Sequence, residues 1–234
     1  MIIAMCGQKG GSGKTTAAIA ASAELVDRGY RVLLVDADPQ GSVRTWADVA
    51  AEAGHPTPTV IAMGAQMHKS GQLDEIASGY DVTVIDCPPR HGEIQRSALM
   101  IADLAVLPCG PSAVDAWALA ESVELVSEAQ GLRPELRATT LITRRVHGTT
   151  IGTEARKSLR NTGLPVLRSE FYARVAYQEA PAAGLGVAQY APTDKAATEV
   201  RAFVTELLKE LSRGKTKAQD RRKKTASGRK RRRA

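Results

Sequence analysis

The residues best suited to chemistry stand near the start of the sequence, in the run Gln8-Lys9-Gly10-Gly11-Ser12-Gly13-Lys14-Thr15-Thr16. Its glycines allow a tight turn in which successive backbone N–H groups point at phosphate oxygens. The lysine at position 14 adds a full positive charge, and a helix beginning there adds a partial one. The first threonine hydroxyl can bind Mg²⁺, and the second can donate a hydrogen bond toward an α-phosphate. This run predicts a nucleotide-phosphate loop.

The loop departs from the common P-loop pattern, which has a glycine six positions before its lysine. That position is Gln8, and a second lysine, Lys9, precedes the paired glycines. The loop follows an apolar strand pattern and opens a helix pattern, which favours phosphate binding over an incidental glycine-rich turn.

Two later apolar runs end in carboxylates. The first closes in Asp36-Ala37-Asp38 and the second in Asp86. Carboxylates at the carboxyl ends of parallel strands lie at the edge where open α/β sheets bind ligands. Phosphoryl transfer needs mainly positioning and electrostatic stabilisation from such groups. An apolar strand that ends in an acid is a weak signal alone, and the order of these runs after the glycine-rich loop strengthens it.

The elements that must position these residues alternate between short apolar runs and helix-period segments, which is typical of βα units around a parallel sheet. We expect one α/β P-loop NTPase domain with a mostly parallel, twisted sheet flanked by helices over residues 1–212, followed by a disordered basic tail over 213–234. The predicted strands are Ile2–Cys6, Arg31–Asp36, Val82–Asp86, Leu104–Pro108, Thr139–Thr143 and a weaker one near Val166. The predicted helices are Lys14–Arg28, Ser42–Ala53, Gly92–Ala102, Ala113–Ala129, Thr150–Thr162 and Asp194–Leu211, with Gly29 ending the first.

Composition excludes several classes of protein. No run approaches the roughly 18 apolar residues of a membrane span, and the short apolar start has no signal-peptide pattern. The cytoplasm is therefore the expected location. Cys6, Cys87 and Cys109 lack metal-ligand spacing and are expected to be reduced core residues.

The net charge of +7 is confined to the end of the chain. From Arg213 onward the sequence has 12 basic residues and one acid, Asp220, whereas the rest is mildly acidic. Such charges neutralise DNA phosphates without reading sequence, and no aromatic residues interleave with them for single-strand stacking. A tail that only aids solubility is the alternative. The predicted contacts to duplex DNA are Arg221, Arg222, Lys223, Lys224, Arg229, Lys230, Arg231, Arg232 and Arg233, with Arg168, Arg174 and Arg201 as further candidates on the folded body.

The run Lys9 to Thr16 resembles the deviant Walker A motif of the ParA/MinD superfamily of ATPases. The segments 35–41 and 82–89 resemble its next two motifs in the same order. The resemblance spans about residues 1–211 and is nearest to small ParF-like partition ATPases. It implies ATP and Mg²⁺ as ligands. It also implies the roles of catalysis for Lys9, Lys14 and Asp38, of metal binding for Thr15, Asp36 and Asp86, and of nucleotide binding for Lys9, Gly10, Gly11, Ser12, Gly13, Lys14, Thr15 and Thr16.

The same resemblance implies a nucleotide-dependent homodimer, in which Lys9 contacts the phosphates bound by the other copy. Asp38 would position and polarise the attacking water. Residues 107–115 resemble a proline-rich segment beside the nucleotide, and residues 141–145 a strand that ends next to the base. Pro108 and Arg144 are therefore expected to contact the nucleotide.

These features together predict a DNA partition ATPase associated with the nucleoid. Its ATP-bound dimer would hold DNA non-specifically until a small centromere-binding or adaptor protein stimulates slow hydrolysis. One alternative is a positioning ATPase for a protein cargo, such as a microcompartment or chemoreceptor cluster. A MinD-like membrane-associated ATPase is less expected, because the tail has no apolar face. A DNA-binding protein that holds nucleotide without turnover is the non-enzymatic alternative.

Overall fold

In the computed structural model, the backbone is described for residues 1–231 and the side chains for residues 1–213 except residue 153. Seven strands form one sheet in which every pairing is parallel, in the order β3-β2-β4-β1-β5-β6-β7. The strands are β1 (Ile2–Met5), β2 (Val32–Asp36), β3 (Thr59–Ala62), β4 (Val82–Asp86), β5 (Leu104–Cys109), β6 (Arg137–Arg145) and β7 (Val166–Tyr172).

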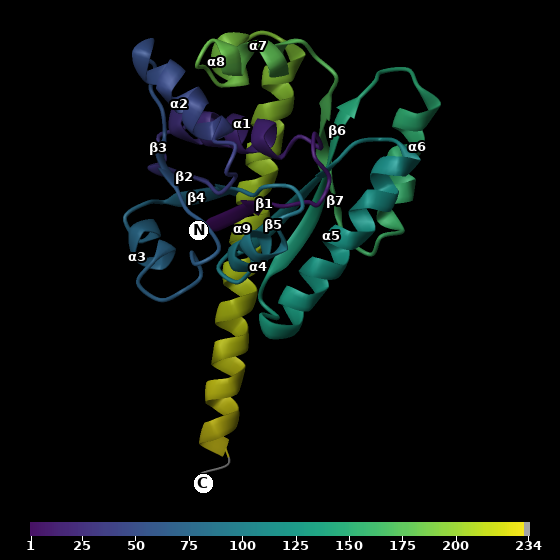
Figure 1. Ribbon diagram of the computed structural model, residues 1–234. Coiled ribbons are helices and arrows are strands. Elements are labelled where there is room, and N and C mark those ends of the chain that lie inside the picture. Colours follow the sequence, from purple (N-terminus) through teal and green to yellow (C-terminus); the bar gives the residue numbers. More distant parts are fainter. Residues whose placement is uncertain (232–234) are drawn as a thin grey trace.

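Helices cover both faces of this sheet (Figure 1). One face carries α1, α2, α7, α8 and α9, and the other carries α3, α4, α5 and α6. The helices are α1 (Lys14–Asp27), α2 (Ser42–Glu52), α3 (Leu73–Ala77), α4 (Gly92–Leu99), α5 (Ala113–Leu132), α6 (Thr150–Arg160), α7 (Ala176–Ala182), α8 (Val187–Tyr190) and α9 (Lys195–Arg231).

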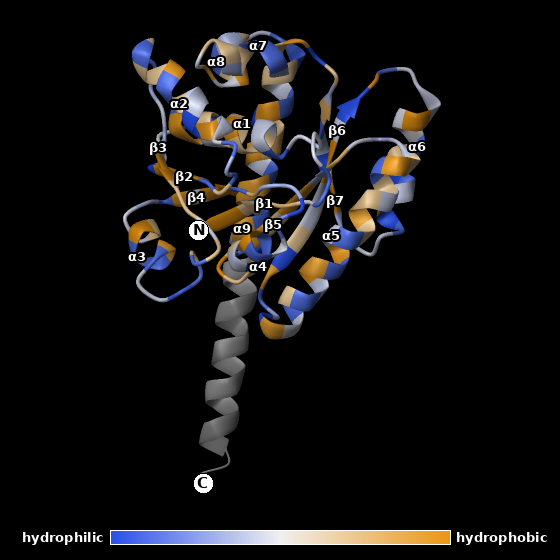
Figure 2. Ribbon diagram, in the orientation of Figure 1, coloured by the Kyte–Doolittle hydropathy of each residue, from blue (hydrophilic) through white to orange (hydrophobic). Residues whose placement is uncertain are grey.

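The central strands are apolar on both faces because both faces are covered. Along β1, Ile3 and Met5 join the core cluster beneath α1 and α9, whereas Ala4 joins the cluster beneath α4 and α5. Figure 2 accordingly shows β1, β2 and β4 as largely hydrophobic. This double burial explains why these segments read as continuous apolar runs, without the alternation of a half-exposed strand.

The strand order brings the predicted motifs to one edge of the sheet. Strand β4 lies between β1 and β2, and Asp86 pairs in register with Met5 on one side and Asp36 on the other. All three strands end here, so the glycine-rich loop and the carboxylates meet at the carboxyl edge, where α/β folds place ligands.

The predicted α/β fold is confirmed, and the structure adds one strand and three short helices to it. All six predicted strands are present, and Gly29 has the left-handed φ of 84° expected after α1. Strand β3 was not predicted because it is a four-residue edge strand, partly exposed and preceded by prolines at 56 and 58. Helices α3, α7 and α8, of 5, 7 and 4 residues, are too short to show a helical period.

Helix α9 continues to Arg231, past Leu211, where the apolar pattern predicted its end. Leu211 is the last buried residue among the described side chains, and the helical backbone goes on beyond it. None of the described helices carries a stretch long and apolar enough to cross a bilayer. The predicted domain boundary at residue 212 stays a prediction.

Candidate nucleotide-binding site

The glycine-rich loop between β1 and α1 has the backbone that phosphate binding requires. Gly13 precedes α1 with a φ of 101°, and a Cβ there would meet Thr143 Cγ2 at 3.3 Å. No side chain caps this helix, so its first-turn N–H groups face the loop without a side-chain acceptor. The Thr143 hydroxyl donates to the carbonyl of Ser12 at 2.7 Å and fixes the loop against β6. The loop therefore presents donors suited to an anion.

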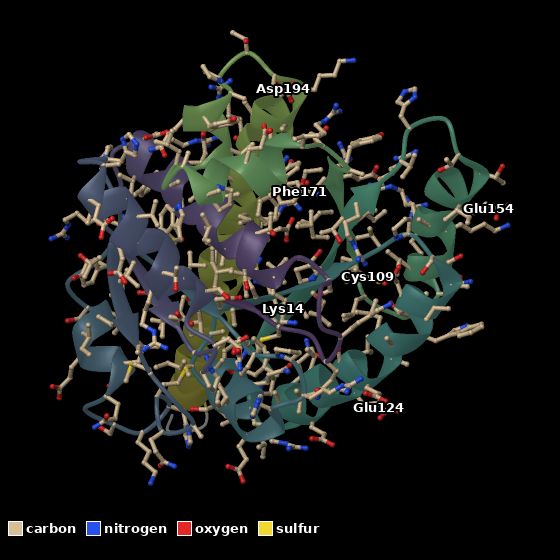
Figure 3. All side chains as sticks on the ribbon, turned by 45° about the horizontal axis from the view of Figure 1, so that its top comes forward. Lys14, Cys109, Glu124, Glu154, Phe171 and Asp194 are labelled. Atoms are coloured by element: carbon tan, nitrogen blue, oxygen red, sulfur yellow. The ribbon has the colours of Figure 1, made fainter. Side chains whose placement is uncertain are left out.

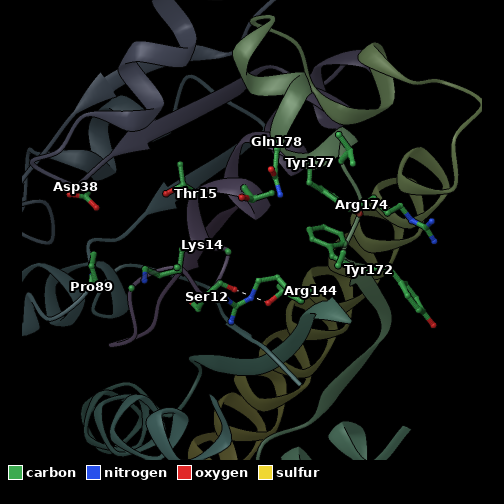
Figure 4. A pocket seen from close by; sticks show the side chains of 18 residues that line it. Ser12, Lys14, Thr15, Asp38, Pro89, Arg144, Tyr172, Arg174, Tyr177 and Gln178 are labelled. Atoms are coloured by element: carbon green, nitrogen blue, oxygen red, sulfur yellow. Dashed lines mark hydrogen bonds between the residues drawn. The ribbon is translucent and has the colours of Figure 1, made fainter. Parts of the chain in front are cut away.

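The loop forms one wall of a cavity of about 560 Å³ (Figure 4). Asp38 and Pro89 lie at one end of it, and side chains from β7 and α7 lie at the other. The phosphate end is polar, whereas Phe171, Tyr172 and Tyr177 bring aromatic rings to the far end. The lining residues are Gly10, Gly11, Ser12, Gly13, Lys14, Thr15, Thr16, Asp38, Pro89, Thr143, Arg144, Phe171, Tyr172, Ala173, Arg174, Val175, Tyr177 and Gln178.

Lys14 is a buried cation in this wall, and it lies in the middle of the molecule, whereas Glu124 and Glu154 lie at its rim (Figure 3). Its Nζ donates to the carbonyl of Lys9 at 2.9 Å. Burial lowers the pKa of Lys14, and the charge of Asp86 works against that shift. A positive charge this poorly hydrated interacts more strongly with a phosphate than an exposed one would.

Asp86 fits a Mg²⁺ ligand on the evidence of its own carboxylate. The residue is 1% exposed, and neither of its buried oxygens has a hydrogen-bond partner among the described residues. Burial raises its pKa to about 7, and the nearby Thr15 hydroxyl works in the opposite direction. Mg²⁺ is commonly held by one or two protein oxygens together with phosphates and water, so a single buried carboxylate beside the phosphate loop fits it.

Replacing Asp86 by asparagine should change how stability depends on pH in the nucleotide-free protein. The folded-state pKa lies above the unfolded value of 3.8, so folded wild type keeps a proton that the unfolded chain loses between pH 4 and 7. Wild type therefore loses stability through this range, by up to about 4 kcal/mol at pH 8. Denaturant unfolding at pH 5 and pH 8 should show Asp86→Asn gaining on wild type at the higher pH. An equal difference at both pH values would contradict the raised pKa.

Asp36 and Asp38 share the turn after β2 but face different partners. Asp36 is buried, with one oxygen accepting the Asp38 N–H at 3.2 Å and the other accepting Arg44 N–H and Nε at 3.1 and 3.3 Å. It therefore shapes the turn, and its predicted metal role stays a prediction. Asp38 lines the cavity, and its Oδ1 accepts the Gln40 N–H at 2.9 Å.

Lys9 lies outside the cavity that Lys14 lines. Its Nζ forms an ion pair with Asp115 Oδ1 at 2.7 Å, and its side chain is 35% exposed. The same carboxylate accepts the Ser112 hydroxyl at 2.5 Å and Arg144 at 3.1 Å. Burial works to raise the pKa of Asp115, but these hydrogen bonds and charges outweigh it and hold the pKa below its usual value. The second lysine is thus bound in its own chain to a carboxylate beside the phosphate loop.

The two residues predicted to contact the nucleotide beyond the phosphate loop line different hollows. Arg144 lines the cavity from the end of β6, where it takes a left-handed φ of 53°. Pro108 is buried in β5 and lines a small hollow beside Lys9 and Asp115, not the cavity. The described structure therefore does not bring Pro108 to the nucleotide cavity.

Several side chains at the site carried no signal in the sequence. Ser122, on α5, accepts the Gln8 N–H at 3.0 Å and helps to hold the phosphate loop. Tyr172 and Gln178 line the far end of the cavity from β7 and α7. They are single residues in segments without a motif, so only the fold brings them together. The expectation for cysteine is confirmed, because Cys6, Cys87 and Cys109 are free and buried.

The predicted DNA contacts lie mostly beyond the described side chains. This applies to residues 221–224 and 229–231, and Arg232 and Arg233 lie outside the described backbone as well. On the folded body, Arg168 lines an open groove of about 540 Å³ with Arg145, Arg156 and Arg160. Arg174 instead pairs with Glu199 at 2.6 Å, and Arg201 donates to the carbonyl of Pro192 at 3.0 Å.

Residues 3–187 match the family model of the CobQ/CobB/MinD/ParA nucleotide-binding domain. The chain is 31% identical to the maintenance of carboxysome distribution protein A of Halothiobacillus neapolitanus, with 88% of this chain and 95% of that protein covered. It is also 31% identical to the chromosome-partitioning ATPase Soj of Thermus thermophilus, with 88% and 94% covered.

Solved structures agree in fold at lower identity. The Mg-ADP complex of the septum site-determining protein MinD of Pyrococcus horikoshii superposes with a TM-score of 0.68 at 19% identity, covering 88% of this chain and 95% of that one. Apo McdA of Cyanothece superposes with a TM-score of 0.71 at 17% identity, covering 88% and 98%.

Proposed function

Because the chain belongs to the CobQ/CobB/MinD/ParA family of nucleotide-binding proteins, we propose that it is a DNA partition ATPase whose ATP-bound homodimer binds DNA without sequence preference. It is an ATPase that uses ATP and Mg²⁺, in line with its family and with the Mg-ADP complex of similar fold. We propose pairing of two copies, DNA binding and partition in addition to this ATPase activity.

The observation that carries the proposal is the position of Lys9. Its ammonium lies outside its own nucleotide cavity, beside the phosphate loop and 35% exposed. A lysine placed there can reach phosphates held by a second copy facing the same edge. Its present partner, Asp115, holds it near the surface through one ion pair. We therefore infer that pairing exchanges this carboxylate for the other copy's nucleotide.

The residues of the cavity divide the chemistry between them. The loop N–H groups and Lys14 hold the phosphates. Asp38, which lines the cavity at the end away from β7 and α7, orients the attacking water. Thr15 and Asp86 would hold Mg²⁺, which neutralises charge that develops on the transferred phosphoryl group. Lys9 of the other copy neutralises the remaining negative charge on this group. Hydrolysis is then slow in one copy alone and is accelerated by a small centromere-binding or adaptor protein.

DNA binding is supported by two basic regions. In the groove of the folded body, Arg145 and Arg156 pair with buried Glu170, whereas no ion pair of Arg160 or Arg168 occurs among the described residues. The second region is the basic segment from Arg213, with 12 basic residues. Unpaired arginines are available for phosphate contacts, which release counterions and weaken with salt. We propose that the DNA-bound protein associates with the nucleoid.

A truncation ending at Ser212 should weaken binding to duplex DNA and flatten its salt dependence. With ATP present, the slope of log affinity against log salt should fall by about 5 or more, because each phosphate contact contributes about 0.9. Arg160→Ala combined with Arg168→Ala should remove roughly 2 from the same slope. Fluorescence anisotropy on a duplex of arbitrary sequence at several salt concentrations measures both changes.

Lys69→Ala provides the matched control for this measurement, since it removes an exposed cation far along the chain from either region. It should leave the slope unchanged. If the truncation also leaves the affinity and slope unchanged, the basic segment has no part in DNA binding.

A second candidate is a positioning ATPase for a protein cargo that uses DNA as its track. It is favoured by the 31% identity to a carboxysome distribution protein over 88% of this chain. The two candidates share the site and differ in the adaptor. Deleting the gene should produce cells without the replicon if the cargo is DNA, and clustered protein bodies with normal DNA inheritance if the cargo is protein.

A further inference from the structure

A buried amide connects the two loops that flank the nucleotide cavity. Gln95, on α4, is 0% exposed. Its Oε1 accepts the Gly7 N–H at 3.2 Å, and its Nε2 donates to the Pro88 carbonyl at 2.8 Å and to the Gly7 carbonyl at 3.5 Å. Gly7 begins the phosphate loop, and Pro88 begins the loop after Asp86. One side chain therefore holds the starts of both loops.

The Gln95 side chain links β1 and β4 just beyond the point where their backbone pairing stops. These neighbouring strands are in register through Met5 and Asp86, and the Cys87 N–H still donates to the Met5 carbonyl at 3.1 Å. Beyond that bond, the chains separate into the two loops. Gln95 bridges them at this point, so a displacement of one loop start is resisted by the other.

The Gln95 amide cannot move without breaking buried hydrogen bonds. Its oxygen and nitrogen are both bonded to backbone groups inside the core, and losing them would leave buried groups unpaired. Downstream of Pro88, Pro89 lines the cavity and Arg90 takes a left-handed φ of 57°. The bridge therefore anchors a short segment that lines the cavity through Pro89 at one end and leads into α4 at the other.

We propose that Gln95 is a positioning residue that couples the phosphate loop to residues 88–92, so that the nucleotide in the cavity sets the conformation of that segment. The inference rests on the proposed nucleotide switch. Gln95 does not touch the cavity, and its effect passes through Gly7 and Pro88. Without the bridge, the phosphates still bind to the loop, but the segment after Asp86 responds to them less.

The test compares Gln95→Met, which keeps the volume but loses both polar atoms, with Gln95→Asn, whose amide is one methylene too short to span both loops. Ser97→Ala is the matched control. Ser97 is on the same helix and 1% exposed, and its hydroxyl bonds to the N–H and ring of His68 at 3.2 and 2.7 Å, away from the cavity. Thermal unfolding establishes that each variant folds, and Gln95→Asn carries the test if Gln95→Met does not.

Two measurements separate coupling from packing. At saturating ATP, kcat of the Gln95 variants should fall by about tenfold while KM for ATP stays within about threefold, a size typical of coupling between sites. Wild type should show a difference in amide hydrogen exchange at residues 90–94 between a non-hydrolysable ATP analogue and ADP, and the Gln95 variants should lose this difference. Ser97→Ala should keep both the rate and the exchange difference.

Gln95 variants that keep wild-type kcat and the exchange difference overturn the inference while leaving the switch intact. A wild type that shows turnover but no nucleotide-dependent exchange at residues 90–94 overturns the coupling and, with it, the proposed switch. Failure of the Gln95 role and failure of the switch are therefore distinguished, because only the second removes the exchange difference from wild type.

Discussion

Replacing Asp38 by alanine is expected to lower the ATPase rate at saturating ATP by at least about 100-fold, the usual contribution of a group that orients or deprotonates a nucleophile. ATP affinity should stay within about threefold, because the phosphates are held by the loop amides and Lys14. Asp38 supports this separation of roles, since it lines the cavity from the turn after β2 and is not part of the phosphate loop. Phosphate release gives the rate, and fluorescent-nucleotide titration gives the affinity.

Asp48→Ala is the matched control, because it removes an exposed carboxylate from the adjacent helix α2. It should preserve both rate and affinity. An Asp38→Ala protein that hydrolyses ATP at the wild-type rate would exclude Asp38 from the chemistry. If wild type itself shows no turnover with or without partner protein, the non-enzymatic alternative replaces the switch.

Replacing Lys9 by alanine is expected to weaken ATP-dependent pairing of two copies by at least about 30-fold, because losing one member of a desolvated charge pair across an interface costs about 2–5 kcal/mol or more. ATP binding by a single copy should change little, since Lys9 lies outside the cavity of its own chain. Sedimentation velocity with Mg²⁺ and a non-hydrolysable ATP analogue measures the pairing.

Asp115→Asn separates the lysine from its present partner. It keeps Lys9 but removes the charge that binds it in its own chain. Pairing should then persist or strengthen. If Lys9→Ala pairs as tightly as wild type, the lysine does not act across an interface.

Sequence was sufficient where the chemistry lies in contiguous residues. The glycine-rich loop with Lys14, and the carboxylates Asp36, Asp38 and Asp86, stood out because each ends or follows a mostly apolar strand. Their convergence followed from parallel pairing, and the register of Asp36 with Asp86 confirms that they share one edge. Local patterns were therefore enough to predict which residues gather at this edge of the sheet.

The remainder depends on contacts between distant segments. Lys9 and Asp115 are 106 positions apart, and Gln95 lies 88 positions from Gly7. A polar residue on a helix reads as a surface group unless the fold shows what surrounds it. The same limit applies to Tyr172, which reaches the cavity only because β7 ends beside it. Pro108 lines a hollow beside Lys9 and Asp115, which its position in a proline-rich segment did not determine, and its contact with the nucleotide stays a prediction.

The most direct test of a nucleotide-gated dimer on DNA is duplex binding by the full chain with ATP, ADP and no nucleotide, for wild type and Lys9→Ala, at two salt concentrations. The account predicts that wild type binds tightest with ATP, that Lys9→Ala loses this advantage, and that higher salt weakens binding throughout. Equal binding in all three nucleotide states, unchanged by Lys9→Ala, would contradict it. The basic segment would then be a constitutive anchor, and the nucleotide would control a protein partner instead.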